Sequence, residues 1–354
     1  MTTAMQPTPH AVHRWNGHVS RVSASDLPEI SEFLRTSFDA RGDAPFASVE
    51  MLRWKYLEPA EHGLEDAAFV LGASGRIVAH AGLRTTRFAG PDGTHVTLGT
   101  IIDWAADRAA PGAGIALYRH LMGQAHATYL IGGTPTTQAV AERLGFRRGL
   151  RARVFARWVR PLDEFLQRPK TARSALRLLH GVAHGPLDRL APTGEWRLRE
   201  VPVFDASIRD ALSAHPAASG FPERTVAALN HRLRNPMAVS RAHVLFRGDH
   251  VAGCAVSSLG TWNARILLLQ GRFENDADQA AAYALVTSEL ARDPHVCRVS
   301  VLSTTASQQH ALAQNGYWLN RAEPVSFYDP SGRSASLGTM AIQYFDADLD
   351  DYSS

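Results

Sequence analysis

The chain has 354 residues, of which 45% are hydrophobic and 20% are charged, and its formal net charge is +3. The length accommodates two domains of ordinary size, and the composition is typical of a globular protein rather than a disordered chain. Two cysteines, Cys254 and Cys297, exclude a disulfide framework and predict a reducing, cytoplasmic location. The histidines are scattered without zinc spacing, so we expect no metal. We also expect neither a membrane span nor a secretory leader.

The first half of the chain carries a regular alternation of elements. In chain order, hydrophobic spacing and turn residues predict a strand at 19–22, helices at 27–38 and 49–56, strands at 67–72, 76–88 and 96–104, a helix at 113–125, a strand at 128–132, a helix at 137–144 and an extended stretch at 146–159. The hairpins and the single crossover predict a mixed, mostly antiparallel sheet with helices on its faces.

A proline-punctuated stretch at 161–195 follows and predicts a helical connector that packs against both halves. Beyond it the order repeats, with helices predicted at 204–213 and 222–233, strands at 242–246, 250–257 and 264–270, a helix at 276–291, a strand at 296–302, a helix at 306–314 and strands at 319–328 and 339–345.

Short sequences repeat together with the elements. WKYLEP at 54–59 matches HRLRNP at 231–236, an offset of 177, and AERLGF at 141–146 matches ALAQNGY at 311–317, an offset of 171 between their glycines. The similar offsets indicate a duplicated domain. We therefore predict an α/β (α+β mixed sheet) fold of two tandem domains, 1–160 and 196–354, joined by the connector.

The two copies differ at one turn. In the first, the strand at 96–104 is followed by Pro111-Gly112-Ala113-Gly114 and then by a helix. A helix that starts at a glycine turn presents unpaired backbone N–H groups and a positive dipole end, which favour a phosphate or pyrophosphate, although many such turns bind nothing. In the second copy the loop at 271–278 is acidic and lacks the paired glycines, so we expect only the first copy to bind an anionic ligand.

The element order, the glycine turn after the fourth strand and the AERLGF helix end resemble the GNAT superfamily of acyl-CoA-dependent N-acyltransferases. The tandem layout is similar to two-copy members, and Trp54-Lys55-Tyr56 with Pro59 is similar to GNAT-like proteins of polysaccharide and natural-product gene clusters. The resemblance covers nearly the whole chain and is more specific in residues 20–160. Two family positions depart from the pattern. Ala109, beside Arg108, stands where a Gln or Arg is usual, and Ala141 stands where a tyrosine acid is common.

The resemblance implies that acetyl-CoA or another acyl-CoA is the co-substrate. Its pyrophosphate would bind the backbone N–H groups of Gly112, Ala113, Gly114, Ile115 and Ala116, with Arg108 nearby. The strand end at Trp104, Ala105 and Ala106 would pair with the pantetheine arm and polarise the thioester carbonyl. Thr134 and Thr137 are candidates for lining the cofactor's path, although Thr134 is equally explained as a helix cap.

Three side chains are candidates for the chemistry of acyl transfer. Asp103 is a carboxylate inside an apolar strand, placed to orient or deprotonate an amine, or simply to bond a loop. His80 is a second candidate base, with a structural role as the alternative. Tyr118 is a candidate proton donor to the thiolate, or a packed aromatic. Trp54 and Tyr56 are candidates for the wall of the acceptor site, or for packing a helix on the sheet.

A run of arginines in the extended stretch leaves a second donor open. It comprises Arg147, Arg148, Arg151, Arg153, Arg157 and Arg160. Alternation along a strand explains it as a solvated face, which we favour, whereas a phosphate-binding surface would suit a tRNA-bound donor. The resemblance to the GNAT superfamily predicts acyl transfer from CoA to an amine of a small molecule, sugar or peptide-like acceptor. The alternatives are a transferase with a tRNA-bound or carrier-bound donor, and a non-catalytic binding protein.

Overall fold

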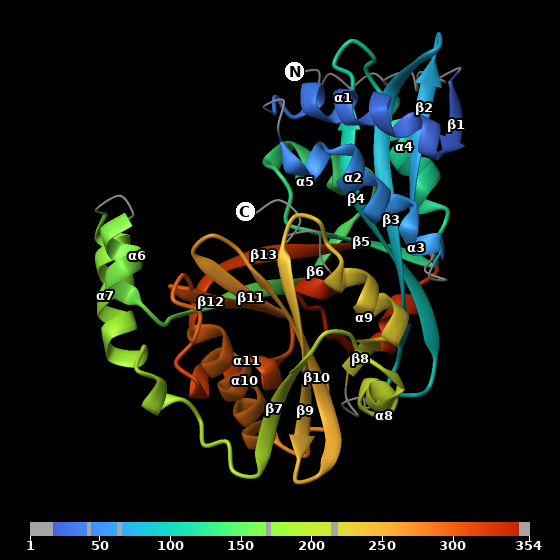
Figure 1. Ribbon diagram of the computed structural model, residues 1–354. Coiled ribbons are helices and arrows are strands. Elements are labelled where there is room, and N and C mark those ends of the chain that lie inside the picture. Colours follow the sequence, from blue (N-terminus) through green and yellow to red (C-terminus); the bar gives the residue numbers. More distant parts are fainter. Residues whose placement is uncertain (1–16, 41–43, 62–65, 168–170, 214–218, 347–354) are drawn as a thin grey trace, which may run out of the picture.

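The computed structural model describes residues 17–40, 44–61, 66–167, 171–213 and 219–346. Figure 1 shows the N-terminal half above the C-terminal half, with helices α6 and α7 projecting to one side. The predicted elements of the first half form in order, and one short helix that was not predicted, α3, follows α2. The elements of this half are β1 (His18–Arg21), α1 (Leu27–Ser37), α2 (Val49–Tyr56), α3 (Glu58–Glu61), β2 (Ala67–Ala73), β3 (Arg76–Ala89), β4 (His95–Ala106), α4 (Ala113–Met122), β5 (Ala127–Ile131), α5 (Pro135–Arg143) and β6 (Arg147–Trp158).

The connector forms two helices, and the second half repeats the order of the first. These elements are α6 (Pro161–Gln167), α7 (Ala172–His184), β7 (Trp196–Val201), α8 (Arg209–Leu212), β8 (Ser219–Pro222), α9 (Val226–Leu233), β9 (Val239–Arg247), β10 (His250–Leu259), β11 (Asn263–Gly271), α10 (Asp276–Ala291), β12 (Arg298–Ser303), α11 (Ala306–Gln314), β13 (Trp318–Tyr328) and β14 (Thr339–Met340).

The second half differs from the prediction where long-range pairing overrides local pattern. The strands β7 and β8 were not predicted, and β8 pairs with β3 of the other half through Phe88 and Pro222. The helix expected from Pro222 therefore begins later, at Val226, where the Thr225 side chain accepts a hydrogen bond from the Ala228 N–H. The helix predicted at 204–213 shortens to a 3-10 turn and α8. The strand predicted at 339–345 shortens to β14.

The two halves share one sheet rather than forming separate ones. The strand order is β1-β2-β3-β4-β5-β13-β6-β12-β11-β10-β9-β7. The last long strand of the C-terminal half, β13, lies between β5 and β6 of the N-terminal half, while β6 pairs with β12 of the C-terminal half. Each half thus completes its sheet with a strand of the other, and the halves cannot separate without breaking backbone hydrogen bonds.

The hydrophobic core has clusters within the N-terminal half and a further cluster that joins the two halves. On one face of the N-terminal sheet, α4 packs Leu117 and Leu121 against β3 and β4. On the other face, α1 and α2 pack Leu27 and Leu52 against β2 and β4. A third cluster joins Phe88 and neighbours of the first half to strands of the second. The halves therefore share buried apolar area, the main source of folding free energy.

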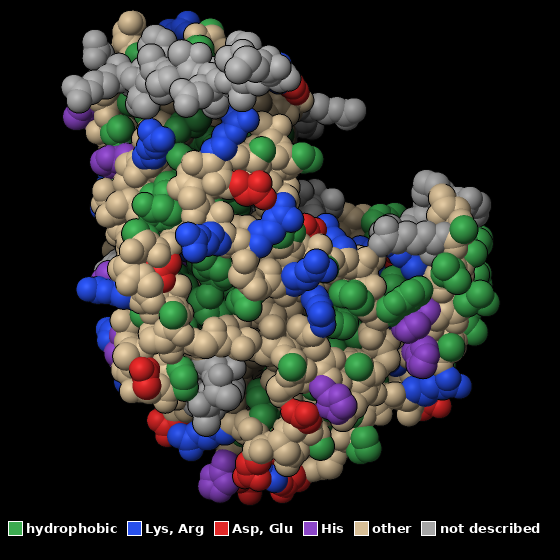
Figure 2. All heavy atoms as spheres, turned by 180° about the vertical axis from the view of Figure 1, so that it is seen from behind, with side chains coloured by type: hydrophobic (Ala, Val, Ile, Leu, Met, Phe, Trp, Pro, Cys, Tyr) green, Lys and Arg blue, Asp and Glu red, His purple; other side chains and the backbone are tan. Residues whose placement is uncertain are grey.

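The connector lies against strands of both halves. The α6–α7 pair contacts the end of β6, where the Trp158 ring meets His180, and His180 in turn meets Trp318 of β13. Figure 2 shows hydrophobic side chains gathered on this projecting pair. The exposed ones are Leu162, Leu166, Leu176, Leu179 and Val182.

Among the described residues, no helix is long and apolar enough to cross a membrane.

Candidate active site

A cleft opens where two parallel strands part. Strands β4 and β5 pair only from Leu98 and Ala127 to Thr100 and Tyr129, and β4 then continues to Ala106 paired with β3 alone. A cavity of about 440 Å³ lies at the point of divergence. It is lined by Phe38, Phe46, Thr100, Ile101, Ile102, Asp103, Trp104, Tyr118, Leu130, Ile131, Gly133, Thr134 and Thr137. The structure thus brings together five of the residues singled out in the sequence.

Asp103 stands at a break in the ladder beside this cleft. The β3–β4 register shifts between His80 and Gly82, so β4 carries one extra residue at this point. Asp103 of β4 has φ of 50°. This left-handed backbone conformation is strained for a residue other than glycine, and such strained residues concentrate at functional sites. The bulge re-aims the Asp103 side chain relative to a regular strand.

The Asp103 carboxylate is held from one side. Its Oδ2 accepts a hydrogen bond from the Tyr56 hydroxyl and lies 2.9 Å from the Lys55 ammonium, and the side chains of Lys55 and Asp103 are each 1% exposed. Oδ1 receives no hydrogen bond from the part of the chain that the structure describes. Asp103, which lines the cleft, therefore keeps one buried carboxylate oxygen without a hydrogen bond.

His80 supports Asp103 from within the sheet. The His80 ring is fully buried, and its Nδ1 lies 3.2 Å from the Asp103 carbonyl oxygen. Burial lowers the pKa of His80 to about 4, so the ring is neutral, and Nδ1 must carry the proton to donate to a carbonyl. The ring meets Tyr56 edge-on and is not among the residues lining the cleft. His80 therefore lies beside the bulge and outside the lining of the cleft.

Trp104 and Tyr118 form the wall of the cleft on the α4 side. Their rings meet edge-on at 5.0 Å, and Trp104 Nε1 donates to the Gly114 carbonyl at 3.0 Å. The Tyr118 hydroxyl is buried and has no partner among the described residues. Burial raises the pKa of Tyr118, so the phenol stays protonated at neutral pH and can donate.

The glycine turn starts α4 as expected. Gly112 is the N-cap with φ of 90°, a conformation that favours glycine. Ala113 N–H is committed to the Ala110 carbonyl and Ala116 N–H to the Gly112 carbonyl, at 3.1 and 2.9 Å. That leaves the N–H of Gly112 at the N-cap and those of Gly114 and Ile115 in the first turn, where helix N–H groups lack an intrahelical acceptor. Three of the five predicted amides therefore remain for an anion.

The other predicted site residues differ in whether they line the cleft. Thr134 caps α5 by accepting from the Thr137 N–H at 3.2 Å, and both residues line the cleft. Ala105 and Ala106 pair with β3. The Arg108 side chain is 85% exposed and lies 3.4 Å from Asp39. Trp54 lines a different pocket and packs against α9, so it is not part of the cleft wall.

The corresponding cleft of the C-terminal half is filled by its own chain. Strands β11 and β12 pair only as far as Ile266 and Val301. Three residues farther along β11, the Gln343 side chain accepts from the Leu269 N–H at 2.9 Å and donates to the Leu269 carbonyl at 3.1 Å. The amide of Gln343 thus takes the place of a neighbouring strand. Leu269 lies three residues beyond the last β11–β12 pair, as Asp103 lies three residues beyond the last β4–β5 pair. The Gln343 side chain therefore occupies the strand edge that borders the cleft in the first copy.

The arginine run divides between interior and surface. Arg157 is 1% exposed and donates to the carbonyls of Asn315, Gly185 and Pro186, while Arg160 donates to carbonyls at the end of α10. Two of the six arginines therefore serve the fold, which removes part of the motive for a nucleic-acid surface.

Among the described residues, no group of three or more His, Cys, Asp and Glu side chains is placed to hold a metal ion.

Sequence reasoning missed three contributors to the site. In the sequence Lys55 is only the middle residue of an aromatic motif, yet in the structure it is the ion-pair partner of Asp103. Phe38 and Phe46, at the end of α1 and before α2, line the cleft from the opposite face. A lysine between two aromatics on a helix with buried faces is the one feature that indicates an internal charge partner. Nothing in the sequence indicates the role of the phenylalanines.

No family model and no curated protein matches the sequence. Solved structures do match. A GCN5-related N-acetyltransferase from Anabaena variabilis matches with a TM-score of 0.60 and 11% identity over 89% of this chain and 73% of that one. A tandem GNAT protein from the clavulanic acid biosynthesis pathway matches with a TM-score of 0.53 and 12% identity over 89% and 98%.

A third match is the N-myristoyltransferase of Saccharomyces cerevisiae with bound myristoyl-CoA, with a TM-score of 0.55 and 11% identity over 92% of this chain and 87% of that one. At such low identities the likeness establishes the fold. The match to a tandem protein extends it over both halves, as the repeated elements and the shared sheet require. The chain therefore has the GNAT fold in its tandem form.

Proposed function

We propose that the N-terminal half binds an acyl-CoA, with acetyl-CoA as the first choice, and transfers the acyl group to an amine. The observation that carries this proposal is the 440 Å³ cleft between β4 and β5. Asp103 and Trp104 both line it, and Trp104 Nε1 donates to the carbonyl of Gly114 in the first turn of α4. The Gly114 and Ile115 N–H groups and the α4 dipole would hold the pyrophosphate. The pantetheine arm would lie along β4 beyond Thr100.

The residues present fit the chemistry of aminolysis. The free Oδ1 of Asp103 accepts a hydrogen bond from the amine and orients its lone pair toward the thioester carbonyl. The amine nitrogen forms a bond to the carbonyl carbon, and the carbon–sulfur bond breaks. The departing thiolate takes a proton, for which the Tyr118 hydroxyl is our candidate donor. The proton that the amine loses passes to solvent, and solvent returns a proton to Tyr118.

His80 and Tyr56 act as positioning residues in this scheme, because neither reaches the cleft with a free donor or acceptor. The two described cysteines are buried free thiols, which suits the reducing cytoplasm in which acyl-CoA is available. No observation in the structure favours a tRNA-bound donor over CoA, so we put forward no second function.

Two measurements test the proposal. Titration calorimetry with acetyl-CoA is expected to give one site per chain, since the C-terminal cleft is closed by Gln343. Release of free thiol in the presence of a panel of primary amines is expected to exceed the rate without amine. Binding without amine-dependent thiol release would indicate a non-catalytic module, and the absence of acetyl-CoA binding would refute the proposal.

A further inference from the structure

The cleft beside Asp103 is lined from both faces of the sheet. Ile101 and Tyr118 belong to the hydrophobic cluster on the α4 face, whereas Ile102 belongs to the cluster under α1 and α2. Phe46 packs against this second cluster and also lines the cleft. Because the proposed acyl-CoA site begins at α4, the part of the cleft that lies towards α1 and α2 is left for the acceptor.

Two phenylalanines form the wall of the cleft on the α1 side. The rings of Phe38 and Phe46 meet edge-on, with their centroids 5.8 Å apart. Phe38 caps the C-terminus of α1 and is 45% exposed, so a large part of this residue is in contact with solvent. An apolar group that covers the ring removes this surface from water, and aromatic groups also pack well edge-on. We call Phe38, Phe46 and Ile102 the α1-side wall.

The cleft offers an acceptor one charged group. Of the described residues that line it, Asp103 alone carries a formal charge at neutral pH, and the Lys55 ammonium lies 2.9 Å from its Oδ2. Asp39 follows Phe38 in the chain but lines another cavity, where Arg108 lies 3.4 Å from it. A second charged group on the acceptor would therefore lose its water without meeting an opposite charge, which costs free energy.

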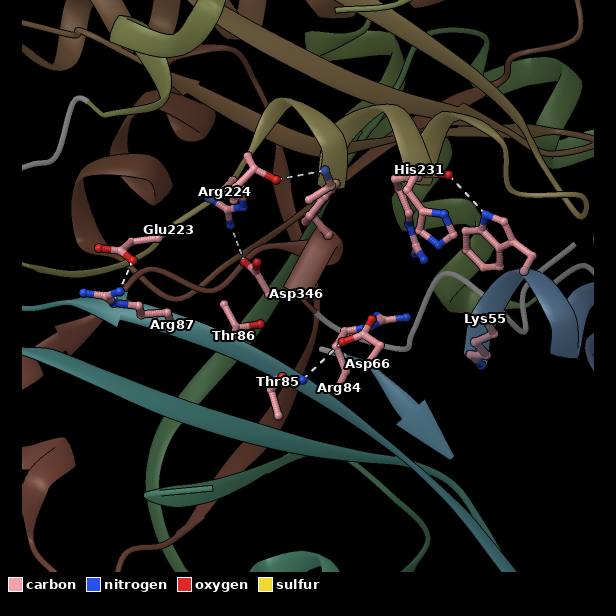
Figure 3. Close-up of a pocket in the computed structure, with 15 residues that line it drawn as sticks. Lys55, Asp66, Arg84, Thr85, Thr86, Arg87, Glu223, Arg224, His231 and Asp346 are labelled. Atoms are coloured by element: carbon pink, nitrogen blue, oxygen red, sulfur yellow. Dashed lines mark hydrogen bonds and ion pairs between the residues drawn. The ribbon is translucent and has the colours of Figure 1, made fainter. Parts of the chain in front are cut away.

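The charged side chains in Figure 3 belong to a separate pocket, between the two halves. This pocket has a volume of about 130 Å³ and shares no lining residue with the cleft. Within it Arg87 is paired with Glu223 at 3.0 Å and Arg224 with Asp346 at 2.5 Å. These charges balance one another across the halves, so we assign the pocket no part in binding the acceptor.

We propose that the acceptor is a small monoamine with an apolar, preferably aromatic, remainder. Its amine would lie at Asp103 and its apolar part against the α1-side wall. The cleft volume of about 440 Å³ lies within the range of small-molecule sites, about 300–1,000 Å³. This inference rests on the proposed acyl transfer to an amine. It selects a small molecule over a sugar amine or a peptide, because their many polar groups would lose water against an apolar wall.

The first test compares acceptors that differ in the part remote from the amine. Thiol release from acetyl-CoA is measured with phenethylamine, propylamine, putrescine and γ-aminobutyrate. We expect kcat/KM for phenethylamine to exceed that for propylamine by about tenfold or more, and the two doubly charged amines to be poorer than propylamine. Equal values, or a preference for either doubly charged amine, would overturn the inference and leave the acyl transfer intact.

A long acyl chain is the other apolar group that could cover the α1-side wall. With propylamine as the constant acceptor, thiol release is compared for acetyl-CoA, butyryl-CoA and octanoyl-CoA. We expect no gain in kcat/KM with chain length, because the wall is reserved for the acceptor. A rise with chain length, without a preference among the amines, would assign the wall to the acyl chain and overturn the inference.

Substitutions at the half-exposed Phe38 test the wall directly. Phe38→Ala should reduce the preference for phenethylamine over propylamine to about threefold or less, whereas Phe38→Tyr keeps the ring and should keep the preference. Phe38→Glu supplies an opposite charge and should raise putrescine relative to phenethylamine about tenfold. Trp262→Glu, at a half-exposed aromatic outside the lining of the cleft, is the matched control. The same change in both Glu variants would contradict a local site.

Equilibrium binding separates this inference from the proposed function. Calorimetry with phenethylamine, propylamine and γ-aminobutyrate, with and without coenzyme A, is expected to show the tightest binding for phenethylamine and its weakening in Phe38→Ala. If phenethylamine binds in this way and no amine stimulates thiol release, the acyl transfer is refuted while the apolar acceptor site stands. If all amines stimulate thiol release equally and none binds preferentially, the site is refuted while the acyl transfer stands.

Discussion

Trp54 and His231 occupy equivalent positions in the two halves and lie against each other where α2 meets α9. The repeat offset of 177 relates them, their rings stack at 5.1 Å with an angle of 14°, and Trp54 Nε1 donates to the His231 carbonyl at 3.1 Å. The Arg232 guanidinium lies over the same indole. The duplicated motif has therefore become an interface between its own copies.

Replacing Trp54 tests this interface. Trp54 is 3% exposed, so Trp54→Ala removes a large buried ring together with its hydrogen bond, and we expect the free energy of unfolding to fall by about 3–5 kcal/mol. Trp262→Phe, at a half-exposed turn, should change it by less than about 0.5 kcal/mol. Urea unfolding followed by circular dichroism measures both. Because the halves share a sheet, a single transition is expected; two separate transitions would contradict that.

The buried Lys55–Asp103 pair should show strong coupling. Asp103→Asn keeps a residue that tolerates positive φ but leaves the Lys55 charge buried beside a neutral amide, which we expect to cost about 3–5 kcal/mol. Adding Lys55→Met removes that charge and should restore part of the loss. A double-mutant cycle in urea provides the coupling energy, and strictly additive effects would show that the pair contributes no interaction.

Two buried histidines should make the protein sensitive to mild acid. Burial lowers the pKa of His80 and of His243 to about 4 each. Below pH 6.5 the unfolded chain binds protons that the folded state refuses, so the free energy of unfolding falls as pH falls toward 4, by about 3 kcal/mol for each histidine. Unfolding measured across this range in His80→Gln and in His243→Gln should each show a shallower slope. An unchanged slope would refute the assignment.

Close packing of α4 against β4 should matter for acyl-CoA binding. A Cβ at Gly114 would lie 2.9 Å from the Ala106 Cβ and 3.1 Å from Trp104 Nε1, so Gly114→Ala must shift the helix start. We expect acetyl-CoA binding to weaken by about tenfold, because the first-turn amides move with it. Gly123→Ala, at the other end of the same helix, meets only the His120 carbonyl at 3.4 Å and serves as the matched control.

The Gln343 side chain should stabilise the C-terminal half. Gln343→Leu leaves the Leu269 N–H and carbonyl buried without partners, at a cost of about 1–3 kcal/mol for each group. Thermal unfolding of this variant is compared with Gln314→Leu, whose side chain is exposed. An equal effect of the two substitutions would mean that the hydrogen bonds of the Gln343 side chain contribute nothing to stability.

The sequence alone determined the elements that depend on local order. Hydrophobic spacing located β4, α4 and α10, the glycine turn located the start of α4, and the repeated motifs revealed the duplication, because helix periodicity, capping and turn chemistry act over a few residues. The sequence offers Asp103 as a carboxylate in an apolar strand, Tyr118 in the helix after the glycine turn and Thr134 after the next strand. The structure gathers these three residues around one cleft.

Only the tertiary structure decided how the copies combine. The exchange of β6 and β13, the stacking of Trp54 on His231 and the insertion of Gln343 beside Leu269 each join residues far apart in the chain. The pairing of Lys55 with Asp103 belongs to the same class. Such contacts are selected by the closure of a shared core and by the need to satisfy buried polar groups, and neither condition leaves a local pattern in the sequence.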